Sequence, residues 1–142
     1  MARLLIWALA LGLAANGLLM LAAPVPWYGL VPGVAESGPL NAHFIRDIGA
    51  AYLVAGGGVV AFLFDRRARP AALAACAFLA LHALVHLWDA AAGRESLVQL
   101  ARDLPLVIVP GPLLFLLLRR RPKSNKETRY AEMADASADR RL

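Results

Sequence analysis

Four long apolar stretches, separated by shorter polar segments, dominate the hydropathy pattern of this chain. They are Leu4–Ala23, Ile48–Phe64, Ala71–Trp88, and a fourth that ends at Leu118 and begins between Leu97 and Leu104. A helix needs roughly 17–25 predominantly apolar residues to cross a bilayer, and each stretch meets this requirement. The pattern therefore predicts an all-α protein, an integral membrane four-helix bundle.

Composition also indicates that the lipid bilayer is the main partner of this chain. Of its 142 residues, 60% are hydrophobic, and the mean hydropathy of +0.58 exceeds that of usual soluble domains. The single cysteine, Cys76, excludes an intrachain disulfide and a CxxC motif. We expect residues 1–121 to form one transmembrane domain and residues 122–142, which are polar, to form a mobile cytoplasmic tail.

The basic residues predict how the helices are oriented. If the N-terminus is cytoplasmic, all 15 lysines and arginines except Arg46, Arg94 and Arg102 lie on the cytoplasmic side. We therefore expect both termini to be cytoplasmic in a multi-pass protein of the bacterial inner (plasma) membrane. The net charge of +5 is concentrated at helix ends and in the tail, so we expect no nucleic-acid partner. The first stretch has features of a signal peptide, but its length and the following Pro24 favour a retained helix.

Small residues and prolines indicate how the helices pack. Ala8, Gly12 and Asn16 recur every four residues, which predicts a helix-packing stripe with Asn16 turned toward a partner. The fourth stretch is interrupted by Pro110, Gly111 and Pro112, which we interpret as a packing kink. The alternative is a broken helix that exposes backbone groups to a substrate or ion. Residues 24–41 are rich in proline and glycine and are predicted to fold as an ordered cap over the outer end.

Two polar clusters lie near the outer ends of the second and third helices. His82, His86 and Asp89 share one helical face. The second cluster is His43, Arg46 and Asp47, and a stripe of small residues below it places His43 and Asp47 toward the bundle interior. Because the two helices are antiparallel neighbours, we expect His43 to approach His86. We also expect Arg46 to pair with Asp89 or Asp47.

The chemistry of these clusters leaves several interpretations open. Imidazoles and carboxylates bind Zn²⁺ or Cu²⁺, and His43, His82 and His86 are the candidate metal ligands. Haem ligation by His43 and His86 is a less favoured possibility, and a quinone could use histidine and aspartate as proton partners. The competing interpretation is a hydrogen-bonded His/Asp/Arg network that only ties the helices together.

The segment Gly38-Pro39-Leu40-Asn41-Ala42-His43-Phe44-Ile45-Arg46-Asp47-Ile48-Gly49 and the four-helix layout resemble small uncharacterised bacterial membrane proteins. The layout is also similar to the DoxX-like group, which includes quinone-linked oxidoreductase subunits. Two functions are therefore predicted. One is a binding or accessory membrane protein, with a membrane-protein partner or a second copy of the chain. The other is a metal- or quinone-dependent redox protein that uses the same residues.

Overall fold

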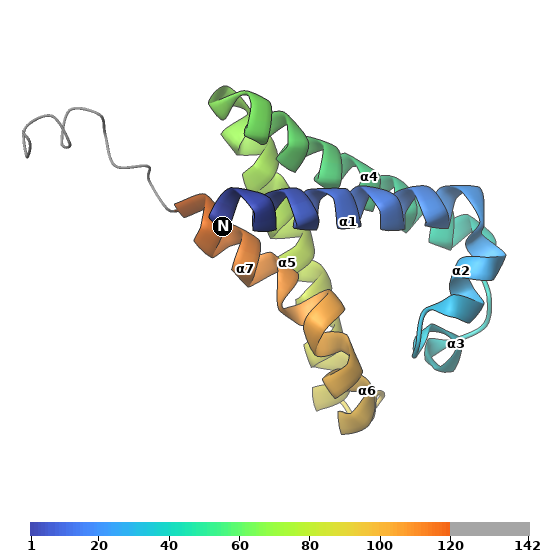
Figure 1. The fold of residues 1–142 in the computed structure, drawn as a ribbon. Coiled ribbons are helices and arrows are strands. Elements are labelled where there is room, and N and C mark those ends of the chain that lie inside the picture. The colour runs from blue at the N-terminus through green and yellow to red at the C-terminus, as the bar shows by residue number, and fades with distance from the viewer. Residues whose placement is uncertain (120–142) are drawn as a thin grey trace, which may run out of the picture.

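In the computed structural model of this protein, residues 1–119 are described, and they form helices and connecting turns without any strand (Figure 1). The elements in chain order are α1 (Ala2–Ala22), α2 (Pro24–Leu30), α3 (Val34–Ser37), α4 (Ala42–Phe64), the 3-10 turn η1 (Arg66–Ala68), α5 (Arg69–Ala91), α6 (Leu97–Asp103), the short π-helical segment η2 (Leu104–Ile108) and α7 (Pro110–Arg119). The expected tail, residues 122–142, lies outside the described residues.

Four helical segments are long and apolar enough to cross a membrane. They are Ala2–Ala22, Ala42–Phe64, Arg66–Ala91 and Leu97–Arg119. Each contains or closely matches one of the four apolar stretches of the sequence, so the all-helical class and the number of spans are confirmed. The chain thus has the helices of a multi-pass membrane protein.

The helices pack as two antiparallel pairs. One pair is α1 with α4, and the other is α5 with the α6–α7 segment; the short turn at η1 joins α4 to α5. Figure 1 shows the two pairs crossing at a wide angle and diverging away from the N-terminus. The core lies where α1, α4, α5 and α7 meet, around Val59, Leu79 and Leu114.

Glycines set the distance between α1 and α4. A Cβ atom added at Gly17 would lie 2.6 Å from the carbonyl oxygen of Gly49, and one at Gly56 would lie 2.8 Å from the backbone nitrogen of Ala14. Backbones can approach this closely only because side chains are absent at these positions. The expected small-residue packing is therefore present, but in a different register.

The stripe predicted on the first helix is wrong in phase, and the stripe predicted on the second is buried at Ala55 but not at His43 and Asp47. Gly12 is exposed, and a Cβ atom added there would meet no neighbouring helix of the described residues within 4 Å. The buried positions of α1 are instead Ile6, Ala10, Leu13, Gly17 and Met20. On α4 the packed positions include Ile45, Gly49 and Tyr52, roughly a third to half of a helical turn away from His43 and Asp47. A membrane span is apolar on every side, so its composition does not mark the packed face.

Residues 24–41 are more helical than their prolines and glycines suggest. The segment contains α2 and α3, and it is fastened by side chains: the indole Nε1 of Trp27 donates to Oδ1 of Asn16 at 2.9 Å. The Tyr28 hydroxyl donates to the carbonyl oxygen of Gly38 at 2.6 Å. Asn16 thus holds a connecting helix, and its amide also contacts the sulfur of Met20.

The fourth span is irregular at and before its proline-glycine-proline sequence. In η2 the backbone nitrogen of Val109 donates to the carbonyl oxygen of Leu104 at 2.9 Å, five residues back. Prolines lack the N–H that a regular helix needs, so this wider turn precedes α7. Pro110 and Gly111 are buried, and a Cβ at Gly111 would lie 3.2 Å from Cβ of Leu79, while Pro112 is exposed. The segment is a packing element against α5.

Candidate functional site

A tight turn sets the register between α5 and α6. Gly93 adopts a left-handed backbone with φ of 71°, which favours glycine, and closes the end of α5. The nitrogen of Arg94 donates to the carbonyl oxygen of Asp89 at 2.8 Å. Ser96 then begins α6, because its hydroxyl accepts from the nitrogen of Gln99 at 3.1 Å. Glu95 lies between these two caps, in the turn that connects α5 to α6.

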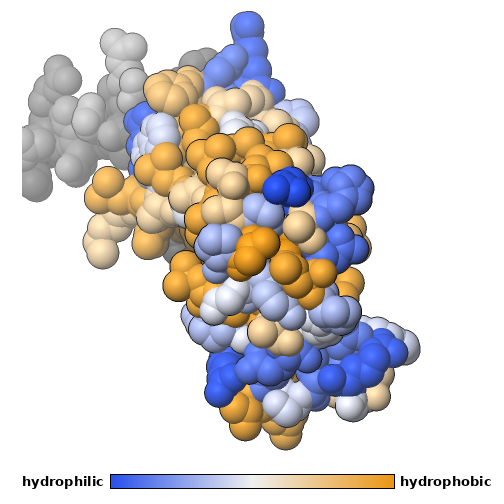
Figure 2. Space-filling model, turned by 90° about the vertical axis from the view of Figure 1, so that its right-hand side faces the viewer, coloured by the Kyte–Doolittle hydropathy of each residue, from blue (hydrophilic) through white to orange (hydrophobic). Residues whose placement is uncertain are grey.

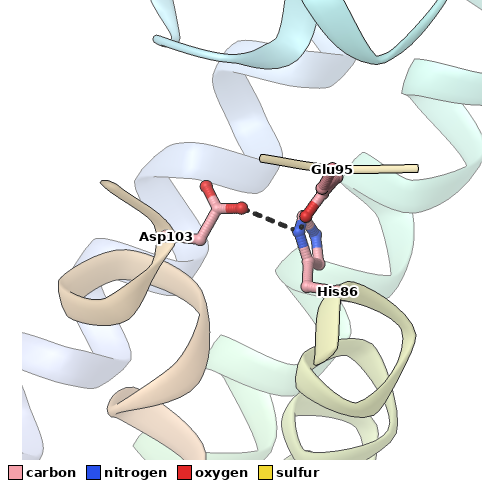
Figure 3. A group of neighbouring side chains, drawn as sticks. All are labelled: His86, Glu95 and Asp103. Atoms are coloured by element: carbon pink, nitrogen blue, oxygen red, sulfur yellow. Dashed lines mark hydrogen bonds and ion pairs between the residues drawn. The ribbon is translucent and has the colours of Figure 1, made fainter. Parts of the chain in front are cut away.

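This register brings together three side chains: His86 of α5, Glu95 of the turn and Asp103 at the end of α6 (Figure 3). We call them the outer cluster, after the side of the membrane on which the basic residues predict them. Nδ1 of His86 lies 2.9 Å from Oδ2 of Asp103 and 3.5 Å from Oε1 of Glu95. Their side chains are 24%, 13% and 10% exposed for His86, Glu95 and Asp103 respectively. Three ionisable groups are thus largely removed from solvent at one end of two membrane-length helices.

The outer cluster is electrostatically incomplete. Oε2 of Glu95 is buried and has no hydrogen-bond partner among the described residues. Arg94 does not supply one, because its Nε and its terminal nitrogen both contact Oδ1 of Asp89 at 2.7 Å. A buried carboxylate oxygen without a partner is costly. The cluster therefore has capacity for one more positive or hydrogen-donating group.

The donor atoms of the outer cluster suit a metal ion. One ligand atom from each of its three residues can be chosen so that all lie within 4.8 Å of one another. One imidazole nitrogen with two carboxylate oxygens is a set that Zn²⁺ and related divalent ions accept. The same set can also accept hydrogen bonds from a cationic or protonated organic ligand.

A polar hollow of about 440 Å³ gives access to the outer cluster through Glu95. It lies between α3 and the α5–α6 turn, and its charged and polar lining includes Glu36, Asp89, Arg94, Glu95, Gln99 and Arg102. Figure 2 shows hydrophilic residues in a band across the lower part of this side of the molecule, the end where α6 lies in Figure 1. A polar ligand in this hollow would therefore meet Glu95, the one residue of the outer cluster that lines it.

Aromatic rings continue from the outer cluster into the span. The ring of His82 lies 5.0 Å from that of His86, centroid to centroid, in an edge-to-face arrangement. His82 also stacks on Phe78 at 6.1 Å and meets Tyr52 of α4 at 5.8 Å. His82 was a predicted metal ligand, but it packs among rings and is not one of the three grouped ligand residues.

The structure divides the other predicted site residues. Asp89 lines the hollow and pairs with Arg94, so the expected Arg46–Asp89 pair is wrong. Arg46 instead donates from Nε to the carbonyl oxygen of Leu21 at 3.3 Å, which closes the end of α1. The five-residue separation across the α5–α6 turn places Arg94 within reach of Asp89, whereas Arg46 lies beside α1.

The second predicted cluster is not brought into the outer cluster. His43 contacts Asp47 at 3.5 Å, four residues along α4, and these side chains are 89% and 60% exposed. The expected interior position of Asp47 is wrong because the packed face of α4 runs through Ile45 and Gly49. Neither His43 nor Asp47 is among the grouped ligand residues, although His43 was a predicted metal ligand.

Two residues of the outer cluster, Glu95 and Asp103, were not selected from the sequence. A signal was present for Asp103, because an acid just before the apolar Leu104–Leu118 run sits opposite a histidine near the end of the preceding antiparallel span. Glu95 depends on the shape of the turn at Gly93, which periodicity does not encode.

Compared with known proteins, the chain matches no family model, no curated protein and no solved structure.

Proposed function

We propose that this chain is a small multi-pass protein of the bacterial inner membrane, of binding or accessory type, whose ligand site is the outer cluster. The observation that carries this proposal is the burial of His86, Glu95 and Asp103 together, with one carboxylate oxygen that no group of residues 1–119 partners. Ionisable groups at the end of membrane helices are costly to retain for packing alone, and apolar residues would tie two helices together equally well.

The proposed orientation has both termini in the cytoplasm and the outer cluster on the periplasmic side. Arg3 lies beside the end of α4, where its guanidinium donates to the carbonyl oxygen of Leu63 at 3.5 Å. The three arginines of the α4–α5 turn and Arg119 at the end of α7 belong to the same, basic end. The positive-inside rule supports a cytoplasmic position for that end.

The alternative is a metal- or quinone-dependent membrane redox protein that uses the same residues. The row of rings from His86 through His82 to Tyr52 favours it, because such a row offers proton-exchanging groups leading into the span. The layout resemblance to DoxX-like proteins is consistent with this alternative. Haem ligation by His43 and His86 has no support, because His43 is exposed beside Asp47.

Accessibility of the outer cluster from the periplasm tests the proposal. The single cysteine is first removed as Cys76→Ala, and Ala92→Cys or Arg67→Cys is then introduced at the two opposite turns. We expect a membrane-impermeant maleimide to label Ala92→Cys in intact spheroplasts and Arg67→Cys only after lysis. The reverse pattern would overturn the periplasmic assignment.

The absorption spectrum of the detergent-purified protein, together with analysis of extracted quinone, separates the alternatives. A chromophore or quinone that co-purifies with wild type and is lost in His86→Ala would favour the redox alternative. A binding or accessory role predicts neither.

A further inference from the structure

We infer that the outer cluster binds a divalent transition-metal ion, with His86, Glu95 and Asp103 as its three protein ligands and Zn²⁺ as the ion that fits best. This inference rests on the proposed function, since it names the ligand class of the same site. It differs from the metal site predicted on His43, His82 and His86, of which only His86 remains.

The distances between donor atoms are close to those of a coordinated ion. Ligand bonds to Zn²⁺ of 2.0–2.2 Å in a tetrahedral site separate neighbouring donors by about 3.3–3.6 Å. Nδ1 of His86 is already 3.5 Å from Oε1 of Glu95 and 2.9 Å from Oδ2 of Asp103. One ligand atom from each of the three residues lies within 4.8 Å of the other two, so small side-chain rotations of the two carboxylates would bring three donors to one ion.

Charge also favours a divalent cation. Two carboxylates face one imidazole within a largely buried site, and among the described residues neither Arg94 nor Arg102 forms an ion pair with Glu95 or Asp103. A bound M²⁺ would balance the two carboxylates, and bidentate binding by Glu95 would also give its buried Oε2 a partner.

The donor types narrow the choice of ion. An imidazole nitrogen favours Zn²⁺ over Mg²⁺ and Ca²⁺, which prefer oxygen ligands only. A Cu⁺ site would need soft sulfur ligands, and Cys76 lies ten residues before His86 on α5, about 15 Å along the helix axis. Three protein ligands leave the fourth position for water or a substrate atom, and Glu95 lines the hollow from which either would enter.

The test uses the full-length protein, purified in detergent with an affinity tag that contains no histidine and stripped with a chelator. Zn²⁺ is titrated by calorimetry, and Co²⁺ serves as a spectroscopic probe because its visible absorption reports nitrogen and oxygen coordination. We expect one Zn²⁺ per chain and a rise in the thermal unfolding temperature when Zn²⁺ is added.

Isosteric variants connect the binding to the three ligands. Glu95→Gln and Asp103→Asn, and also His86→Ala, are each expected to weaken Zn²⁺ binding by at least about tenfold. His43→Ala and Asp47→Asn are the matched controls, since they remove a histidine and an acid outside both the outer cluster and the hollow, and we expect wild-type affinity for both. Gel filtration and circular dichroism show which variants fold, and Glu95→Gln preserves shape in case Asp103→Asn does not fold.

Absence of stoichiometric Zn²⁺ binding would overturn the inference, as would binding that Glu95→Gln and His86→Ala leave unchanged. Loss of binding in His43→Ala would do the same, because it would move the site to α4. If Zn²⁺ does not bind but Ala92→Cys is labelled from the periplasm, the metal inference fails and the periplasmic site stands. If Zn²⁺ binds but the labelling is reversed, the metal site stands and the proposed orientation fails.

Discussion

Helices α1 and α4 meet through glycines and apolar side chains, whereas α5 and the α6–α7 segment carry buried charge at one end of their contact. In the first pair, Gly17 and Gly49 let the backbones touch, and its described charged groups, among them Arg3 and Arg46, lie at the ends. In the second pair, Gly111 packs on Leu79 in the span, but His86 and Asp103 meet at the end of the pair beside the α5–α6 turn. Both are antiparallel helix pairs, and they differ in whether buried ionisable side chains lie at their contact.

The difference assigns separate roles to the two pairs. Close backbone contact stabilises a membrane helix pair without any polar group, as α1 and α4 demonstrate. Helix packing therefore does not require the buried imidazole and the two carboxylates of the second pair. The irregular segment η2 follows directly after Asp103 in the same pair. We interpret α1–α4 as the scaffold and α5–α6 as the part that carries the site.

Asp103→Ala is expected to have the largest effect on stability. The substitution removes the closest partner of His86 from a site that is largely buried. Removing one member of a buried pair costs about 3–5 kcal/mol, and we expect about 3 kcal/mol because Glu95 remains near His86. Thermal unfolding in detergent measures this, with the exposed Asp47→Ala as control. Equal unfolding temperatures for the two variants would contradict the burial that separates the two acids.

Gly17→Val is expected to destabilise the scaffold pair by about 1–3 kcal/mol. A Cβ at Gly17 would lie 2.6 Å from backbone atoms of Gly49 and Leu53, so α1 and α4 must separate. Gly12→Val is the matched control, because it makes the same change on the same helix where no atom lies within 4 Å. Thermal unfolding of both variants checks the prediction. If they unfold at the same temperature, the glycine contact does not hold the pair.

The sequence predicted the spans well because crossing a bilayer imposes length and apolarity on each segment separately. The faces that pack were not predictable in the same way. Ala8 and Gly12 have the four-residue spacing of a packing stripe, yet Ala10 and Gly17 make the contact, since both faces of a span are apolar. Which face is buried depends on the partner helix, and one helix's own pattern does not contain that information.

The site was predictable in part for a related reason. His86 stands out because an ionisable residue in an apolar stretch is costly and therefore informative. Its partners depend on the register of the α5–α6 turn, which Gly93 and Ser96 determine through a left-handed residue and a helix cap. Arg46 and Asp89 illustrate the limit: sequence reasoning paired opposite charges across helices, and Asp89 instead pairs within its own turn.

Gly33→Ala tests how the connecting segment 24–41, which contains α3, packs against α6. Gly33 has φ of 89°, where an L side chain costs about 1–2 kcal/mol, and its position next to the side chain of Gln99 brings the α3 segment against α6. We expect faster proteolysis of residues 24–41 and a modest fall in thermal stability. Gly29→Ala, within α2 and with open space around it, is the control. Identical proteolysis patterns would show that α3 does not depend on this backbone conformation.

His43→Ala is expected to have the smallest effect. It distinguishes the outer cluster of the structure from the site on His43, His82 and His86 that the sequence predicted. The His43 side chain is 89% exposed, and among the ionisable groups that the structure describes it contacts Asp47 alone, at 3.5 Å. An exposed pair within one helix contributes little, so unfolding should change by no more than about 0.5 kcal/mol. His86→Ala removes the same kind of side chain from the outer cluster and should lower both stability and Zn²⁺ affinity. Thermal unfolding with and without Zn²⁺ compares the two variants directly. If His43→Ala abolishes the Zn²⁺-dependent rise as completely as His86→Ala, then α4 supplies a ligand, and the division between a scaffold pair and a site-bearing pair is wrong.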